Sequence, residues 1–385
     1  MLVAVEPSGD EIGAAFLAAL KSLAPEAEFL GCGGPLMAAV GFQSLFEIDA
    51  LSVMGFLDVI RAFPEATKRA DALADAAAAE AVDAVVFIVG WYFSRAAAAR
   101  MNKRGVKAKR FKLVAPQIWA SRPQRVHFVR KHFDGVLCLL PFEPPLFEKA
   151  GVKAAFIGNP NFQHAWRMRG DGARFRARHQ LGDAPLLAVL PGSRRSEATI
   201  LLPIFSEAAR LVADRLPALR IVVAPAPQIE ALVAPVVKTW PGAPIIAAPE
   251  EKADAFAAAD AALAKSGTVT TELAIASTPM AVAYKFDPLT AFWLKRVVTT
   301  RYASILNIAA GSEVIPEFIQ RGCRADYLAG AALKLLTDKE ARLDQLEAFP
   351  PLLAYLGVDG PPAARRAAEI ILAWMDGSQA AGNRQ

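Results

Sequence analysis

The sequence contains little cysteine: Cys32, Cys138 and Cys323 are the three among 385 residues. They are odd in number, widely separated and include no CxxC pair, so a disulfide framework and a structural zinc site are both disfavoured. A reducing compartment such as the cytoplasm fits this usage.

Long hydrophobic runs are also missing. The apolar stretch at residues 84–93 (AVVFIVGWYF) is far shorter than the ~18–20 residues that span a bilayer, so it predicts a buried strand. The first residues show neither a basic segment nor a small-residue cleavage site, so we expect no secretory signal peptide. The hydrophobic fraction of 54% and the mean hydropathy of +0.29 reflect alanine-rich helices that alternate with short aliphatic strands.

Acidic side chains are absent from residues 84–133, although this segment carries twelve Lys or Arg residues. The twelve are Arg95, Arg100, Lys103, Arg104, Lys107, Lys109, Arg110, Lys112, Arg122, Arg125, Arg130 and Lys131. Such a concentration suggests an anionic partner, which would be phosphate groups, an anionic membrane surface or nucleic acid. A solvated helix face with an adjoining loop is the alternative. No nucleic-acid-binding module accompanies the charge, so we expect no nucleic acid partner.

Short aliphatic strands alternate with helices along the chain, which predicts an α/β fold whose parallel sheets are covered on both faces. The alternation stops near Gly158-Asn159-Pro160 and in an Arg- and Gly-rich stretch at residues 167–178, and then restarts. We therefore predict two doubly wound, Rossmann-like lobes, residues 1–162 and 163–345, followed by a helical tail, residues 346–385. Ligands of such sheets bind at the carboxyl ends of the strands, so we expect the site in a cleft that both lobes face.

Two glycine-containing turns in the second lobe have the form of anion-binding sites. Gly192-Ser193-Arg194 follows the strand LLAVL and precedes a helix, so backbone N–H groups and a guanidinium are available to a diphosphate. Ser266-Gly267-Thr268 repeats the arrangement, and Glu272 in the following helix is spaced to accept hydrogen bonds from ribose hydroxyls. Each turn alone also fits an ordinary connection or a capped helix. The presence of both favours a nucleotide site.

The first lobe has a matching turn and an apolar segment. Ser8 and Gly9 follow the first strand, with Glu6 before them and Asp10 after them, although turn-forming chemistry alone explains such a sequence as well. Residues 51–63 carry large apolar side chains nearly all round, which fits core packing or a surface for lipid. No DxD pair and no cluster of His and carboxylate residues occurs, so we expect no metal and no cofactor. Charge on a leaving diphosphate would then be met by arginine and helix ends.

These motifs, in this order, resemble those of the lipid-A-disaccharide synthase family over essentially the whole chain. The matching segments are Ser8-Gly9-Asp10, Val53-Met54-Gly55, Leu140-Pro141-Phe142-Glu143, Leu190-Pro191-Gly192-Ser193-Arg194, Ser266-Gly267-Thr268 with Glu272, and Asn307 with Gly311. A single match is a weak signal, whereas the six together in one order are specific.

The resemblance implies a GT-B fold and an inverting sugar transfer that needs no metal. Family members transfer a sugar from UDP-2,3-diacylglucosamine to the 6-hydroxyl of 2,3-diacylglucosamine 1-phosphate, at the cytoplasmic face of the inner membrane. By this resemblance the first lobe binds acceptor and membrane, the second binds the UDP-sugar, and Arg194, Glu272 and Asn307 contact the UDP part. The implied partners are a UDP-acylglucosamine donor, an acylated sugar phosphate acceptor and an anionic membrane surface. A homodimer stays open.

Several family residues are replaced in the first lobe. The segment that reads roughly IDxPDF in the family, whose first Asp is the expected general base, is Ile88-Val89-Gly90-Trp91-Tyr92-Phe93 here, so both acids are missing. The family's GHP becomes Gly158-Asn159-Pro160, its WAWR becomes Trp119-Ala120-Ser121-Arg122, and the Pro before Asn307 becomes Leu306. The second lobe keeps nearly all of its turns.

Three hypotheses follow from this mixture. The first is a synthase with a substitute base, for which Glu6, Asp10 and His127 are the available groups, although spacing supports none of them. A positioned base contributes about 10²–10⁴-fold to a rate, so transfer without one would be feeble. The second is a degenerate paralogue that binds UDP-sugar or lipid without turnover. The third is a transferase with a changed acceptor, whose chemistry is rebuilt around Trp91 and Tyr92.

Overall fold

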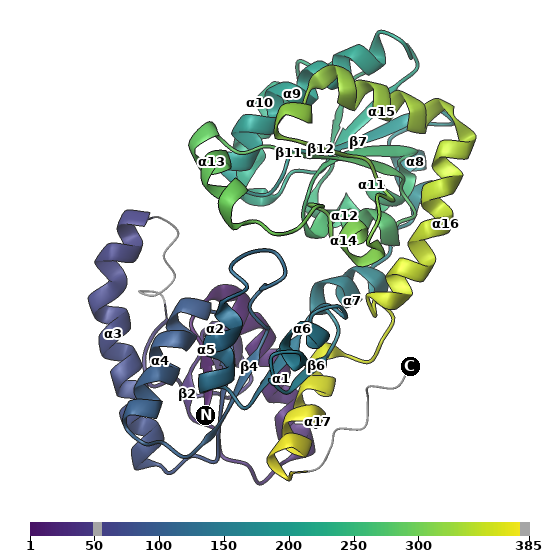
Figure 1. The fold of residues 1–385 in the computed structure, drawn as a ribbon. Helices are drawn as coiled ribbons and strands as arrows, with labels where there is room; N and C mark the ends of the chain where they lie inside the picture. Colours follow the sequence, from purple (N-terminus) through teal and green to yellow (C-terminus); the bar gives the residue numbers. More distant parts are fainter. Residues whose placement is uncertain (49–55, 378–385) are drawn as a thin grey trace. The chain divides into compact units, whose positions relative to one another are not determined.

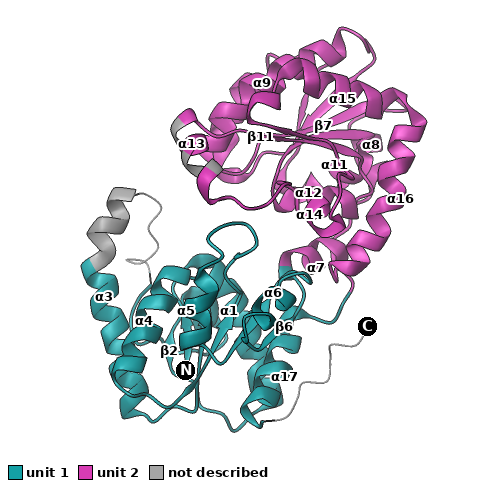
Figure 2. Ribbon diagram, in the orientation of Figure 1, with its two compact units in different colours: residues 1–160, 360–385 teal, residues 161–359 magenta. Residues whose placement is uncertain are grey.

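The computed structural model describes residues 1–48 and 56–377, with the backbone alone at residues 56–63, 289 and 293–295. These residues form two compact units (Figures 1 and 2). Unit 1 comprises residues 1–160 together with the segment from residue 360 onward, and unit 2 comprises residues 161–359. Each unit is a parallel sheet covered by helices around its own hydrophobic core.

Within the described residues, the sheet of unit 1 has six parallel strands in the order β2-β1-β3-β4-β5-β6. The strands are β1 Leu2–Ala4, β2 Gly31–Cys32, β3 Ala84–Ile88, β4 Lys109–Leu113, β5 Gly135–Cys138 and β6 Ala154–Phe156. The helices are α1 Pro7–Leu23, α2 Pro35–Ala39, α3 Phe56–Ala79, α4 Trp91–Lys103, α5 Arg125–His132, α6 Pro144–Glu148 and α17 Ala363–Met375. Strand β3 is buried along its whole length, as expected for an aliphatic strand covered on both faces.

The strand order of unit 1 changes direction at β1. The chain first pairs β1 with β2 on one side and then places β3 on the other side, in parallel. The connections that follow β1 and β3 therefore lie next to each other at the carboxyl edge of the sheet. Open α/β sheets bind their ligands at such a switch point.

Helix α17 packs in unit 1 against α1 and β4, far from both in the sequence. Its Trp374 ring lies over Gly135, where a Cβ atom would come within 2.4 Å of the ring, so only glycine fits beneath it. The Lys109 side chain donates hydrogen bonds to the terminal carbonyl oxygens of α17 at Trp374 (3.0 Å) and Met375 (2.7 Å). A cation at the carboxyl end of a helix also suits the helix dipole.

Within the described residues, the sheet of unit 2 has six parallel strands in the order β12-β11-β10-β7-β8-β9. The strands are β7 Leu186–Leu190, β8 Arg220–Val223, β9 Ile245–Ile246, β10 Ala261–Lys265, β11 Met280–Tyr284 and β12 Glu317–Ile319. The helices are α7 Pro160–Arg167, α8 Gly172–Arg178, α9 Arg195–Ala213, α10 Glu230–Val237, α11 Lys252–Ala258, α12 Thr268–Ile275, α13 Pro288–Val297, α14 Ile305–Ala310, α15 Ala325–Thr337 and α16 Lys339–Tyr355. Strand β7 pairs with both β8 and β10, so the switch point of this sheet lies between β7 and β10.

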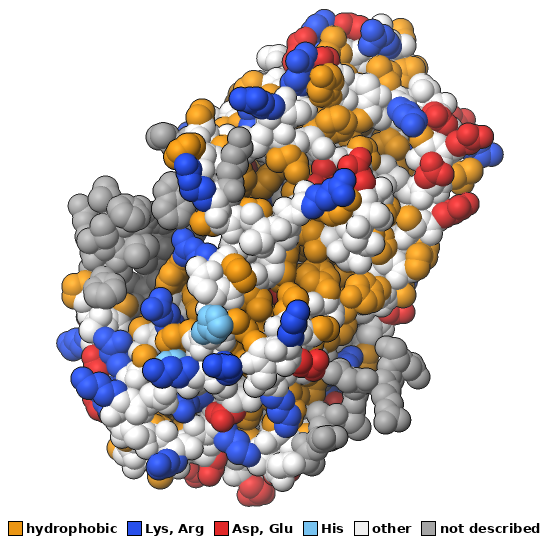
Figure 3. Space-filling model, in the orientation of Figure 1, with side chains coloured by type: hydrophobic (Ala, Val, Ile, Leu, Met, Phe, Trp, Pro, Cys, Tyr) orange, Lys and Arg blue, Asp and Glu red, His pale blue; other side chains and the backbone are white. Residues whose placement is uncertain are grey.

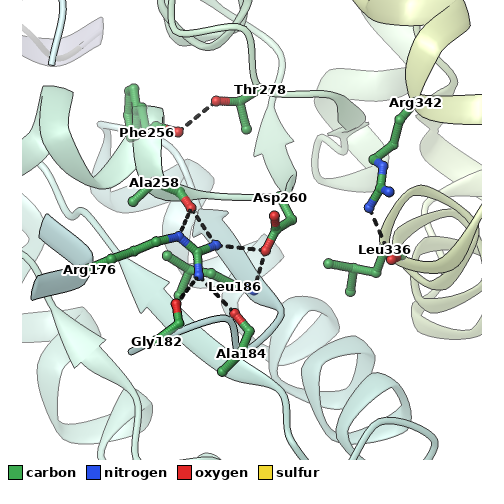
Figure 4. A network of polar contacts seen from close by, with 10 residues as sticks. All are labelled: Arg176, Gly182, Ala184, Leu186, Phe256, Ala258, Asp260, Thr278, Leu336 and Arg342. Carbon is green, nitrogen blue, oxygen red and sulfur yellow. Dashed lines mark hydrogen bonds and ion pairs between the residues drawn. The ribbon is translucent and has the colours of Figure 1, made fainter. Parts of the chain in front are cut away.

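A network around Arg176 fixes the amino ends of β7 and β10 (Figure 4). The Arg176 guanidinium on α8 donates to the carbonyl oxygens of Gly182, Ala184 and Ala258 and pairs with the Asp260 carboxylate at 2.8 Å. The same carboxylate accepts a hydrogen bond from Leu186 N at the start of β7. Five donors in a planar fork suit this role, because several carbonyls can be satisfied at once.

The predicted fold class is confirmed: the chain forms two doubly wound, Rossmann-like α/β units. No described helix is both long enough and apolar enough to cross a membrane. The apolar segment at residues 51–63, with its VMG motif, lies outside the residues whose side chains are described.

Candidate functional site

The two glycine turns of unit 2 lie side by side at its switch point. The first follows β7, where Gly192 has φ +111°, a backbone conformation that favours glycine, and leads through Arg194 into α9. The second follows β10, where Gly267 precedes α12. Because β7 and β10 are hydrogen-bonded neighbours, the amino ends of α9 and α12 are brought to the same edge. Both helices present free backbone N–H groups there.

An ion-pair chain connects the two turns. Glu197 in the first turn of α9 pairs with Lys265 at the end of β10 (3.0 Å) and with Arg194 (3.2 Å). Burial alone would raise the pKa of Glu197, but its hydrogen bond and charge pairing with Lys265 outweigh burial and lower it. Burial lowers the pKa of Lys265, against the opposing effect of Glu197. The edge thus holds two cations and one anion.

A cavity of about 280 Å³ opens at this edge. Gly192, Ser193, Gly267, Thr268 and Glu272, all predicted from the sequence, line it. A second cavity of about 680 Å³ also lies in unit 2 and shares Thr268 and Glu272 with the first. Lys252 on α11, which the sequence did not suggest, lines both cavities and forms an ion pair with Glu272 at 2.5 Å.

Three predicted substrate-binding residues of unit 2 line neither cavity. Arg194 is 73% exposed and does not line either cavity, although its turn does. Ser266 is buried and its hydroxyl donates to the Ala303 carbonyl. Asn307 is fully buried: its side-chain oxygen accepts from Val314 N and Ile315 N, and its amide nitrogen donates within the same segment. The Asn307 side chain therefore holds a loop of unit 2 together in this structure.

At the switch point of unit 1, the Ser8-Gly9 turn begins α1 and Gly9 packs against β3. A Cβ atom at Gly9 would lie 3.2 Å from the Ile88 carbonyl oxygen, so the two strand ends approach closely here. Ser8 is exposed and Gly9 is buried. These two residues therefore lie at the carboxyl edge of the sheet, at its switch point.

The three candidate bases have different surroundings. Asp10 is 3% exposed, and its carboxylate accepts hydrogen bonds from the backbone N–H groups of Gly34, Leu36 and Met37 at 2.8–2.9 Å, which caps the start of α2. His127 is exposed on α5. Glu6 lies half-buried at the end of β1. Of the three, Glu6 has the carboxylate placed at the switch point.

Two valines at the carboxyl ends of β3 and β4 have left-handed backbone conformations. Val89 has φ +52° and Val114 has φ +69°. A β-branched residue rarely adopts this conformation, and such strain costs about 1–3 kcal/mol and concentrates at functional sites. The sequence gives no sign of it, because nothing in a Val-Gly or Leu-Val pair signals a positive φ.

Lys112 holds this strained edge from inside the sheet. Its side chain is 1% exposed, and its ammonium donates to the carbonyl oxygens of Phe87, Val89 and Leu113. Burial lowers the pKa of Lys112 to about 7, while the nearby charge of Glu6 raises it. Sequence patterns predict that a lysine in a strand is exposed to solvent. The burial of Lys112 was therefore not predicted.

The WASR and LPFE segments also meet in unit 1. Glu143 is 3% exposed and accepts hydrogen bonds from Trp119 Nε1 (2.9 Å) and Leu140 N (3.0 Å). Burial raises the pKa of Glu143 to about 7, and these hydrogen bonds oppose the shift. The carboxylate thus fixes the loop that follows β4.

The basic stretch divides into internal and surface cations. Arg100 on α4 and Arg104 directly after it pair with Asp71 and Asp75 on α3, Lys109 binds the end of α17, and Lys112 is buried. The exposed members on and next to α4 and α5 are Arg95, Lys103, Lys107, Arg130 and Lys131. We call these five the α4–α5 basic surface; blue side chains gather over this part of unit 1 in Figure 3. Over the described residues, no group of three His, Cys, Asp or Glu side chains is arranged to hold a metal ion.

Comparisons with known proteins identify the family and the fold. A family model described as lipid-A-disaccharide synthetase matches residues 1–349. A lipid-A-disaccharide synthase from Rhodospirillum centenum is 40% identical over 374 residues, which cover 96% of this chain and 93% of that protein. Two solved structures are similar in fold alone. The S. aureus MnaA–UDP structure has a TM-score of 0.64 at 12% identity and covers 97% of this chain and 96% of its own.

The second structure, an α,α-trehalose-phosphate synthase (UDP-forming) from Burkholderia vietnamiensis, has a TM-score of 0.56 at 12% identity and covers 98% of this chain and 99% of its own. These likenesses confirm the GT-B-like fold. The family match extends over both units, including the turns at the carboxyl edges of β1, β7 and β10. On this evidence the chain belongs to the lipid-A-disaccharide synthase family.

Proposed function

We propose that this chain is a glycosyltransferase of lipid A biosynthesis that moves 2,3-diacylglucosamine from UDP to the 6-hydroxyl of 2,3-diacylglucosamine 1-phosphate. The observation that carries the proposal is the pair of adjacent glycine turns at the switch point of unit 2, which open onto one cavity in a chain of this family. A site that had lost donor binding would have no reason to keep both turns, and here five predicted residues line the cavity together.

In this proposal the UDP part binds unit 2. The amino ends of α9 and α12 offer backbone N–H groups to the diphosphate, and the Arg194 guanidinium adds a flexible cation at the rim. Glu272 on α12 faces the cavity and would exchange its ion pair with Lys252 for ribose hydroxyls. Stabilising the charge of the departing UDP in this way requires no metal.

The acceptor then belongs to unit 1. The α4–α5 basic surface suits an acylated sugar phosphate held at an anionic membrane surface, because each Lys or Arg near such a surface contributes about 1 kcal/mol of attraction. We accordingly place the protein at the cytoplasmic face of the inner membrane, as a peripheral protein.

Donor binding and turnover are tested separately with purified protein. Calorimetry with UDP-2,3-diacylglucosamine measures binding, and UDP release is followed with and without the acylated sugar phosphate. Removing a charge-assisted hydrogen bond costs about 1.5–3 kcal/mol, so Arg194→Ala should raise the dissociation constant about 10–150-fold. The exposed neighbour Arg195 provides the matched control, Arg195→Ala.

Acceptor-dependent UDP release that is lost in Arg194→Ala and kept in Arg195→Ala supports the transferase. Binding without release would point to the non-catalytic paralogue, which binds the donor and does not turn it over. No binding at all would contradict the assignment of unit 2 as the donor site.

A further inference from the structure

Glu6 has a carboxylate that the fold does not use. It occupies the position before the first turn of α1, where a side chain normally caps the helix, yet it makes no capping hydrogen bond. It is half-buried, and within the described residues its carboxylate makes no hydrogen bond or ion pair. Asp10, four residues later, is by contrast fully engaged by three backbone N–H groups. A half-buried carboxylate without a partner is costly, which suggests that it is kept for a ligand.

The Glu6 carboxylate lies against the turn that joins β3 to α4. A Cβ atom at Gly90 would lie 3.6 Å from Glu6 Oε1, so this oxygen sits over the Val89-Gly90 peptide. This is the switch point of unit 1, where β1 and β3 end side by side. Val89 is also the position where the resemblance expects an acid. The oxygen of Glu6 thus occupies the space next to the missing carboxylate.

The same turn has an unfavourable backbone conformation and is fixed by a hydrogen bond from a buried lysine. Val89 and Gly90 both have positive φ, at +52° and +38°, and the Lys112 ammonium binds the Val89 carbonyl from the buried side. Lys112 is the charged group that faces Glu6 across the turn.

We propose, resting on the proposed transfer, that Glu6 is the general base that accepts the proton of the acceptor hydroxyl. The O–H bond breaks and its proton goes to the Glu6 carboxylate, while the oxygen forms a bond to the anomeric carbon of the donor. The bond from that carbon to the diphosphate breaks, its electron pair leaves with UDP, and Glu6 later returns the proton to water. Lys112 is a positioning residue, because it acts through the Val89 turn.

The other titratable candidates near this edge are placed less well. The Asp10 oxygens are occupied in capping α2, and His127 points to solvent from α5. Tyr92 is 68% exposed on α4, and its hydroxyl accepts a hydrogen bond from Arg122 at 3.2 Å. Glu6 is the one of the four with an unused carboxylate at the strand ends.

The test compares Glu6→Gln with the wild type and with Glu11→Gln, a matched change at an exposed position of the same helix. Acceptor-dependent UDP release is measured alongside donor binding. Loss of a general base lowers turnover about 10²–10⁴-fold, so we expect kcat of Glu6→Gln to fall in that range with donor affinity unchanged. Glu11→Gln should keep the wild-type kcat.

A rescue variant separates loss of the base from loss of the fold. The double variant Glu6→Gln/Val89→Asp restores a carboxylate at the neighbouring position, in a backbone conformation that Asp tolerates better than Val. We expect it to recover at least about tenfold in kcat over Glu6→Gln, towards the rate that a positioned base supplies. A merely structural role of Glu6 would not be rescued in this way. Wild-type kcat in Glu6→Gln would overturn the proposal.

A failure of the proposed transfer would look different. If the wild type binds donor but releases no UDP with acceptor, Val89→Asp alone decides between the two claims. Release in Val89→Asp would overturn the role of Glu6 and leave the substrates standing. No release in either protein would overturn the proposed transfer, and the role of Glu6 with it.

Discussion

Each unit has its own doubly wound sheet, but the pKa shifts of ionisable groups at the two carboxyl edges have different causes. In unit 2 burial alone would raise the pKa of Glu197, but its hydrogen bond and ion pair with Lys265 lower it. In unit 1 burial prevails, and it moves Lys112 down to a pKa of about 7 and Glu143 up to a pKa of about 7. Both of these shifts favour the neutral form.

The difference shows what each edge demands of its residues. The edge of unit 2 has paired charges, glycine turns and helix ends, which are largely local features. The edge of unit 1 holds ionisable groups close to neutrality, supported by strain and by hydrogen bonds from distant segments. The following substitutions test this difference between the two edges, in order of decreasing expected effect.

The largest expected effect is the change in folding stability with pH that the buried Lys112 causes. Between about pH 7 and the ordinary lysine pKa of 10.5, the unfolded chain keeps a proton on Lys112 that the folded chain has lost. Folding stability should therefore rise with pH across this window, by up to about 5 kcal/mol. In urea unfolding, the unfolding free energy of the wild type minus that of Lys112→Met should increase from pH 7 to pH 10. Lys107→Met, at an exposed site, is the control, and a flat difference would contradict the buried-lysine account.

Asn307→Ala should cost about 4 kcal/mol of unfolding free energy. It leaves the buried N–H groups of Val314 and Ile315 without their acceptor, and each such group costs about 1–3 kcal/mol. Urea denaturation measures the loss, with Ser312→Ala in the same exposed loop as the control. A loss under about 1 kcal/mol, together with a collapse of donor affinity, would instead make Asn307 a ligand contact.

Glu143 should give the opposite pH dependence to Lys112. Its pKa is raised from 4.5 to about 7, so the folded chain binds more protons than the unfolded chain between these values. Stability from this group should fall as pH rises from about 4.5 to 7, by about 3 kcal/mol. Glu143→Gln should abolish that slope, as followed by urea unfolding across the same range. The control Glu80→Gln, at an exposed site, should keep this slope. If the slope persists in Glu143→Gln, groups other than Glu143 cause it.

The smallest effect concerns strain. Val89→Asn places a residue that tolerates the left-handed conformation at φ +52°, so it should stabilise the chain by about 1 kcal/mol. Thermal unfolding is sensitive enough to detect this, and Val298→Asn at an exposed site without a positive φ should change stability by less than about 0.5 kcal/mol. If Val89→Asn destabilises the protein, packing of the valine outweighs the backbone strain.

Sequence reasoning predicted the edge of unit 2 better than the edge of unit 1, for a physical reason. The local sequence around Gly192 and Gly267 predicts their turns, and the adjacent strands β7 and β10 bring the two turns together. The role of Asp10 depends on residues 34–37, and that of Lys112 depends on carbonyls of a neighbouring strand. No local pattern encodes such contacts. Packing of α17 on unit 1 is equally non-local, since it needs the space that Gly135 leaves for Trp374.

The return of α17 to unit 1 also bears on how the chain is made. Unit 2 is continuous in sequence, so it can fold as soon as α16 has left the ribosome. Unit 1 starts first but lacks α17 until about 200 further residues have been added, a delay on the order of 10–40 s at common rates of synthesis. During that interval the face of β4 and β5 around Gly135 is bare and open to capture by other chains. Synthesis from the amino end therefore completes unit 2 before unit 1, although unit 1 is begun first.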